Sequence, residues 1–181
     1  TLFPYTTLFR SRTKWVHWVT IVRPKEVKTS TAMLFITGGA NDGRPRTSVD
    51  GAIRAVAENT GSVVAELRMV PNQPLVFGDD PKPGRKRSED AIIAYTWRKY
   101  LETGDTSWPL RLPMTKAAVR AMDTVTAFLK SAEGGALTVD KFFVAGASKR
   151  GWTAWTTGVV DKRVVGMAPI EIGRASCRER V

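Results

Sequence analysis

Apolar positions follow two different periods along this chain, and the period changes several times. Continuous or alternating apolar runs typical of strands occupy residues 15–22, 32–37, 62–70, 141–145 and 163–169. Apolar residues recur at helical spacing between them, over 49–59, 89–103, 115–132 and 149–160. A strand, a helix and a strand between residues 32 and 70 imply a right-handed parallel unit. The pattern therefore predicts an α/β fold of three layers, with helices on both faces of a mostly parallel sheet.

Cap and turn residues set the expected bounds of these helices. Ser48 and Ser88 stand where N-caps are expected, and Gly61 and Gly104 stand where the first two helices should end. The Pro- and Gly-rich segment 71–87 is expected to be an irregular excursion above the sheet. The residues expected to face inward are Ile53, Val56 and Ala57, then Ile93, Trp97, Tyr100 and Leu101, then Ala118, Ala121, Met122, Val125, Phe128 and Leu129.

The strand at 141–145 runs into a serine flanked by small residues, Gly146-Ala147-Ser148, and a helical pattern begins at Lys149. A sharp strand-to-helix turn of this kind lifts the serine oxygen above the sheet edge, as in a nucleophile elbow. The usual G-x-S-x-G pattern has a small residue where this chain has Arg150. An ordinary turn with a capping serine is the alternative interpretation.

An acyl-transfer site also needs N–H donors for an oxyanion. The amide of Lys149 follows the serine, and Gly39 stands in a glycine loop at the end of the apolar strand 32–37, where a second amide is expected. An acid and a histidine should come later in the chain, beyond Ile170. The only histidine, His17, precedes the serine and is more typical of a structural residue.

Four further residues near this turn are candidates for core or ligand contacts. Trp152 and Trp155 share a helical stripe and are expected in the core, whereas Trp108 stands on a loop and is expected to line a cleft. Arg150 either pairs with Asp161 or faces an anionic substrate, and the structural role is favoured.

Composition narrows the function classes. The chain has 181 residues, 43% of them apolar, which is enough for one domain with a core, and no apolar run approaches a membrane span. Its net charge is +11, but the basic residues are scattered, and the one dense run, 82–87, lies between acidic pairs as in a solvated loop. We therefore expect no nucleic-acid partner, and no motif suggests a metal or cofactor. The single cysteine, Cys177, lies near the end of the chain.

Both ends of the sequence look foreign to the domain. Residues 1–11 are the translation of a DNA string that resembles a common sequencing adapter, and residues 171–181 translate its reverse complement after one added base. We expect the domain to be residues 12–170, open at both ends. Each end segment contributes one net positive charge, so the part between them carries +9.

Several stretches together resemble the PhoPQ-activated pathogenicity-related protein family. They are 15–17, 34–39, 70–77 and, most specifically, 146–155 with 160–169. The resemblance implies an α/β-hydrolase fold, truncated here after the strand that follows the serine's helix, in a bacterial exported or envelope-associated protein without a settled substrate. In that family Ser-Lys-Arg-Gly is itself the elbow pattern. The resemblance thus implies Ser148 as nucleophile, acting on a small or peptide-like acyl substrate.

Overall fold

The computed structural model describes residues 14–41 and 48–171, and the account below concerns these. Apart from Glu171, the two end segments expected to be foreign, 1–11 and 171–181, lie outside the described residues. The proposed domain boundaries therefore stay a prediction.

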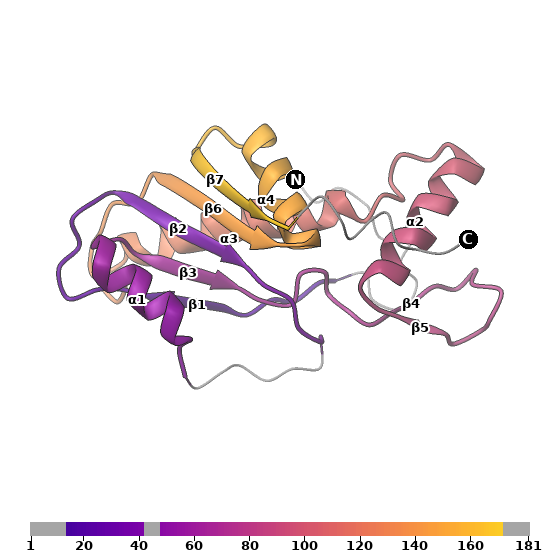
Figure 1. Ribbon diagram of the computed structural model, residues 1–181, viewed down its shortest axis with the longest axis horizontal. Helices are drawn as coiled ribbons and strands as arrows, with labels where there is room; N and C mark the ends of the chain where they lie inside the picture. Colours follow the sequence, from indigo (N-terminus) through magenta and orange to yellow (C-terminus); the bar gives the residue numbers. More distant parts are fainter. Residues whose placement is uncertain (1–13, 42–47, 172–181) are drawn as a thin grey trace.

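A five-stranded sheet forms the centre of the molecule (Figure 1). Its strand order is β1-β3-β2-β6-β7. Four neighbouring strands are parallel, whereas β1 pairs with β3 in antiparallel fashion. The carboxyl ends of four strands thus meet at one edge of the sheet, where ligands bind in open α/β sheets. The strands span β1 (Val19–Val22), β2 (Thr31–Ile36), β3 (Val64–Leu67), β6 (Lys141–Ala147) and β7 (Val164–Ile170).

Helices cover both faces of this sheet, which gives the three layers that the sequence predicts. Helix α1 (Gly51–Thr60) lies on one face, and α3 (Arg111–Lys130) and α4 (Lys149–Val160) lie on the other (Figure 1). The predicted α/β class with a mostly parallel sheet is confirmed.

Alternating side chains of β2 separate the core into two parts. Leu34 and Ile36 point into the main core against α3 and α4 and are at most 1% exposed. Met33 and Phe35 point to the opposite face, where they pack beside Ile53 of α1. The alternation follows from the two-residue period of a strand, which places neighbouring side chains on opposite faces.

A separate group of elements lies beyond the carboxyl edge of the sheet. It contains the hairpin β4 (Leu75–Val76) and β5 (Lys86–Arg87) and the helix α2 (Asp90–Thr103), seen to the right in Figure 1. The segment 71–87, expected to be irregular, therefore carries a short hairpin. The ring of Tyr95 contacts Phe77, with ring centroids 4.5 Å apart, and Trp108 packs edge-on against Tyr95. We refer to this group, residues 70–110, as the α2 lobe.

The two predicted N-cap serines are not the caps. Asp50 caps α1 and accepts a hydrogen bond from the Ala52 N–H at 2.8 Å, so the expectation for Ser48 is wrong. Glu89, not Ser88, stands at the N-cap position of α2. Both serines lie one or two residues too early, an error typical of boundaries read from sequence. Gly61 and Gly104 end their helices in the left-handed conformation as predicted.

The buried faces of the helices agree with the prediction for α3 and differ for α2. Five of the six residues predicted to face inward on α3 are buried, and Phe128 is 43% exposed. On α2 the buried residues are Ile92, Tyr95 and Thr96, whereas Leu101 is 78% exposed. The helix packs within the lobe and not on the sheet. Its buried face is therefore rotated, by about one residue, from the face expected for a helix that covers a sheet.

Candidate functional site

Ser148 lies between β6 and α4 in a backbone conformation that is rare for any residue with a side chain. Its φ is 55° and its ψ is −123°, and its side chain makes no capping hydrogen bond to the helix that follows. Strain of this kind costs on the order of 1–3 kcal/mol and tends to occur at functional sites. The alternative interpretation of an ordinary capping serine therefore does not describe this turn.

Two backbone contacts hold the turn at Ser148. The Ser148 N–H donates to the Ile170 carbonyl at the end of β7 at 2.8 Å, and the Ser148 carbonyl accepts from the Trp152 N–H at 3.2 Å. The chain folds back so sharply that a Cβ at Gly146 would lie 2.6 Å from the Arg150 carbonyl oxygen. A glycine is thus required two residues before the serine, as a nucleophile elbow requires.

The glycine loop lies beside this turn at the same edge of the sheet. Ile36 of β2 pairs with Gly146 of β6, so the chain two residues further on reaches Gly38 on one strand and Ser148 on the other. Gly39 has a φ of 129°, which a residue with a side chain rarely adopts. The start of α4 and this loop thus lie at the same edge of the sheet.

Charged residues after the serine are anchored on one carboxylate of the α2 lobe. Arg150 donates to both oxygens of Glu89, at 2.9 and 2.7 Å, and Lys149 Nζ lies 2.7 Å from Glu89 Oε2. Lys149 also pairs with Asp90 at 3.1 Å. The side chains of Arg150 and Lys149 are only 12% and 10% exposed. Arg150 thus has a structural role as favoured, but its partner is Glu89. The expected partner, Asp161, pairs instead with Arg163 at 2.7 Å.

The cations around Glu89 keep it ionised. Burial alone would raise the pKa of this carboxyl group, but hydrogen bonds from Arg150, Lys149 and Gln73 outweigh that effect and lower its pKa to about 2. The guanidinium of Arg111 lies 3.6 Å above the Trp152 ring, and burial lowers its pKa to about 10. The start of α4 is therefore an electropositive region compensated chiefly by Glu89 and Asp90.

Trp108 and Trp155 do not lie where the sequence predicts them. Trp108 is 6% exposed and packs in the core of the α2 lobe, so it does not line a cleft in the described structure. Trp155 is 53% exposed, because the buried face of α4 is made by Gly151, Thr153, Ala154 and Thr157. Small residues on that face let α4 approach the sheet closely, and a sequence pattern that counts large apolar residues misses them.

His17 contacts the backbone after β3 and a neighbouring aromatic ring. Its Nδ1 lies 3.0 Å from the Arg68 carbonyl oxygen, and its ring packs edge-on against Trp15. Burial lowers its pKa, opposed by the backbone contacts to Arg68 and Met69. Its contacts are those of the structural histidine that the sequence analysis favours.

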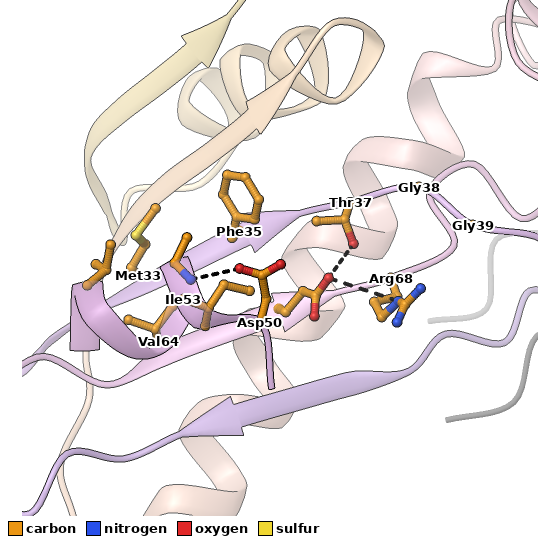
Figure 2. A pocket seen from close by; sticks show the side chains of 12 residues that line it. Met33, Phe35, Thr37, Gly38, Gly39, Asp50, Ile53, Val64 and Arg68 are labelled. Atoms are coloured by element: carbon orange, nitrogen blue, oxygen red, sulfur yellow. Dashed lines mark hydrogen bonds and ion pairs between the residues drawn. The ribbon is translucent and has the colours of Figure 1, made fainter. Parts of the chain in front are cut away.

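A pocket of about 510 Å³ lies between α1 and the sheet, on the face opposite α4 (Figure 2). Apolar side chains such as Phe35 and Ile53 form its inner part, and Gly38 and Gly39 form one end. Near that end the Thr37 hydroxyl donates to Glu66 at 3.0 Å, and the Arg68 Nε lies 4.0 Å from the same carboxylate. The pocket reaches the glycine loop, but Ser148 does not line it.

In residues 14–41 and 48–171, no group of three or more His, Cys, Asp or Glu side chains could hold a metal ion. No helix in these ranges is long and apolar enough to span a membrane.

An α/β sheet with a strained serine at a strand-to-helix turn and a glycine loop beside it defines a protein with an α/β-hydrolase-like structure. The chain belongs to the PhoPQ-activated pathogenicity-related protein family, whose model matches residues 7–181. That match runs into both end segments suspected to be foreign, and it leaves their origin open.

Two individual proteins are similar to this chain. Autocrine proliferation repressor protein A of Dictyostelium discoideum is 45% identical over 158 residues, which are 86% of this chain and 31% of that protein. The chain thus spans about a third of the relative's length. A solved structure of an α/β serine hydrolase homologue from Coxiella burnetii is 13% identical in sequence, with a TM-score of 0.31. The match covers 77% of this chain and 50% of the Coxiella chain. A likeness this distant says nothing about individual residues.

Proposed function

We propose that the protein is a serine hydrolase of ester, amide or peptide-type acyl groups, with Ser148 as nucleophile. The observation that carries the proposal is the strained backbone of Ser148. The strain lowers stability, and the side chain makes no capping hydrogen bond that would offset it. A hydroxyl held free at a sheet edge, ahead of a helix N-terminus, is placed to attack a carbonyl and form an acyl-enzyme.

The oxyanion of that attack would be held by backbone amides. The N–H groups of Lys149 and Gly39 are our candidates, because they follow the serine and close the neighbouring strand, the two positions from which such donors come. Each such donor contributes on the order of 3 kcal/mol to lowering the barrier. The substrate needs only an acyl carbonyl, and we assign no cofactor.

The general base and its acid are proposed to lie outside this sequence. The single histidine is bonded to the Arg68 carbonyl and comes before the serine in the chain. Because the chain spans 31% of its relative, the complete protein has room for later strands that carry an acid and a histidine.

Ester hydrolysis by the full-length protein tests this function. We expect measurable turnover on a panel of short and long acyl esters, and its loss in Ser148→Ala. Ser131→Ala is the matched control, because Ser131 also lies at a helix end but bonds the Phe128 carbonyl and is remote from the proposed site. Equal turnover in the parent and in Ser148→Ala would remove Ser148 as the nucleophile.

A non-catalytic binding protein of the bacterial envelope is the second candidate. It is favoured by one observation, that no proton acceptor among the described residues is bonded to the Ser148 hydroxyl. The similar Dictyostelium protein is named an autocrine proliferation repressor, a name that describes a regulatory role. The complete coding sequence separates the two candidates: a histidine in the loop after the last strand supports hydrolysis, and its absence supports binding.

A further inference from the structure

Glu89 sits at a point where three loops of the carboxyl sheet edge meet. The first is the turn at Ser148, reached through Lys149 and Arg150. The second is the segment after β3, where Arg150 Nε donates to the Val70 carbonyl at 2.5 Å. The third is the glycine loop, which Glu89 reaches through Gln73. A single carboxylate thus connects the elements that carry both proposed oxyanion amides.

The link to the glycine loop runs through reciprocal hydrogen bonds. Gln73 accepts from the Glu89 N–H at 2.7 Å, and its own side-chain amide donates back to the Glu89 carboxylate. The Gln73 carbonyl accepts from the Asn41 N–H at 2.5 Å, and Gln73 bridges to Ala40, the residue after Gly39. Gln73 is 7% exposed, so these contacts are shielded from water.

Arg150 supplies a second, direct contact with the glycine loop. Its guanidinium lies so close to Gly38 that a Cβ at that position would collide with it. A bidentate pairing with Glu89 fixes the plane of the guanidinium, which a lysine could not reproduce. Arg150 thus contacts both the glycine loop and the Glu89 carboxylate.

Glu89 has a backbone conformation almost identical to that of Ser148. Its φ is 51° and its ψ is −127°, and it starts α2 without a side-chain capping bond. Its side chain is therefore turned away from its own helix and toward Lys149 and Arg150. Its carboxylate makes its contacts outside its own helix, which points to a role in another part of the molecule.

From these contacts we propose that Glu89 is a positioning residue that fixes the turn at Ser148 and the glycine loop relative to each other through Arg150. The expected effect on the reaction rate rests on the proposed hydrolase function. The expected effect on the position of the two loops does not. A displacement of one oxyanion donor by about 1 Å can lower the rate of acylation about 100-fold. Glu89 itself touches no substrate.

The test uses Glu89→Gln in the full-length protein, with Asp80→Asn as the matched control. Asp80 pairs with Arg87 at 2.6 Å in the same lobe and contacts neither loop. We expect Glu89→Gln to lower kcat about 10-fold to 100-fold with KM nearly unchanged, and to slow fluorophosphonate labelling of Ser148 equally. Asp80→Asn should lower neither by more than about twofold, whatever it costs in stability. Equal rates in Glu89→Gln and the parent overturn the proposal.

Amide hydrogen exchange separates this proposal from the hydrolase function. If the parent has no activity, faster exchange of residues 146–152 in Glu89→Gln, absent in Asp80→Asn, still supports the positioning role, and unchanged exchange overturns it. If Glu89→Gln does not fold, Arg150→Lys gives the same test, because it keeps the charge and loses the bidentate geometry.

Discussion

At the scale of single residues, five described residues other than glycine have a positive φ, and two of them, Ser148 and Glu89, belong to the proposed site. Ser148 and Glu89 share nearly the same φ and ψ, begin α4 and α2 respectively, and cap neither helix. Their contacts converge, because Glu89 pairs with the two residues that follow Ser148. Part of the local cost in stability thus falls where the proposed chemistry takes place.

Replacing Ser148 with glycine should stabilise the protein and abolish its proposed activity. Glycine adopts a positive φ without a steric penalty, so we expect the free energy of unfolding to rise by about 1 kcal/mol in Ser148→Gly. Ser148→Ala keeps the Cβ and should leave that free energy nearly unchanged. Urea denaturation of the two variants and the parent measures the difference, and equal midpoints for all three would contradict the strain.

The Glu89 carboxylate should make stability depend on acid pH. Its pKa is lowered from 4.5 in the unfolded chain to about 2 in the folded protein. A lowered pKa contributes stability that is complete above about pH 4.5 and is lost as the pH falls toward 2. In Glu89→Gln this part of the dependence should disappear. Thermal unfolding between pH 2 and pH 6 measures it, and parallel curves for parent and variant would refute the ionised pair.

At the scale of elements, the strand-to-helix turn was predictable and the partner of Arg150 was not. An apolar run ending in small residues around a serine is a local signal, and β6 and α4 follow it closely. The pairing of Arg150 with Glu89 joins residues 61 positions apart, through a lobe whose packing no local pattern describes. The sequence shows Glu89 only as an acidic residue at a helix start, whereas Asp161, the expected partner, lies much closer to Arg150 along the chain.

Burial on α4 was mispredicted for a physical reason. Thr153, Ala154 and Thr157 are fully buried, whereas Trp155 and Val159 are 53% and 75% exposed. Periodicity identifies which residues share a helix face, but the choice of face depends on what the sheet can accommodate. Threonines can be buried on a helix because their hydroxyls bond to carbonyls one turn earlier, as Thr157 does to Thr153 at 2.7 Å.

Neighbouring phenylalanines on β6 offer a test of the layer arrangement. Phe142 is fully buried in the main core, whereas Phe143 points to the opposite face and is 39% exposed. We expect Phe142→Ala to lower the free energy of unfolding by about 3–5 kcal/mol and Phe143→Ala by about 1 kcal/mol. Chemical denaturation compares the two, and a larger loss for Phe143→Ala would contradict the assigned faces.

At the scale of the whole molecule, the positive charge is distributed, and part of it is engaged in ion pairs. The net charge is +11, yet Arg87, Lys149, Arg150 and Arg163 lie in ion pairs. In the basic run 82–87, Arg87 pairs with Asp80 and its guanidinium lies over the Tyr95 ring at 4.4 Å. The remaining basic side chains of that run are exposed to solvent, as expected for a solvated loop.

Nucleic-acid binding should accordingly be weak and nonspecific. We expect a short DNA duplex to be shifted only at low salt and the complex to be lost by 200 mM. Scattered basic side chains contact few phosphates at once, so binding releases few counterions and is weak. A gel-shift series between 25 and 200 mM salt measures this. A complex that persists at 200 mM with sequence preference would show a nucleic-acid function that the charge distribution does not indicate.

Covalent labelling of Ser148 tests the central claim most directly. The full-length protein is treated with a fluorophosphonate, and the modified residue is located by mass spectrometry. Because a hydroxyl reacts with such a probe only when it is activated, we predict one modified serine, Ser148, and no labelling of Ser131 or Ser107. A protein that remains unmodified, or that is labelled equally at several exposed serines, would contradict the account of Ser148 as a nucleophile.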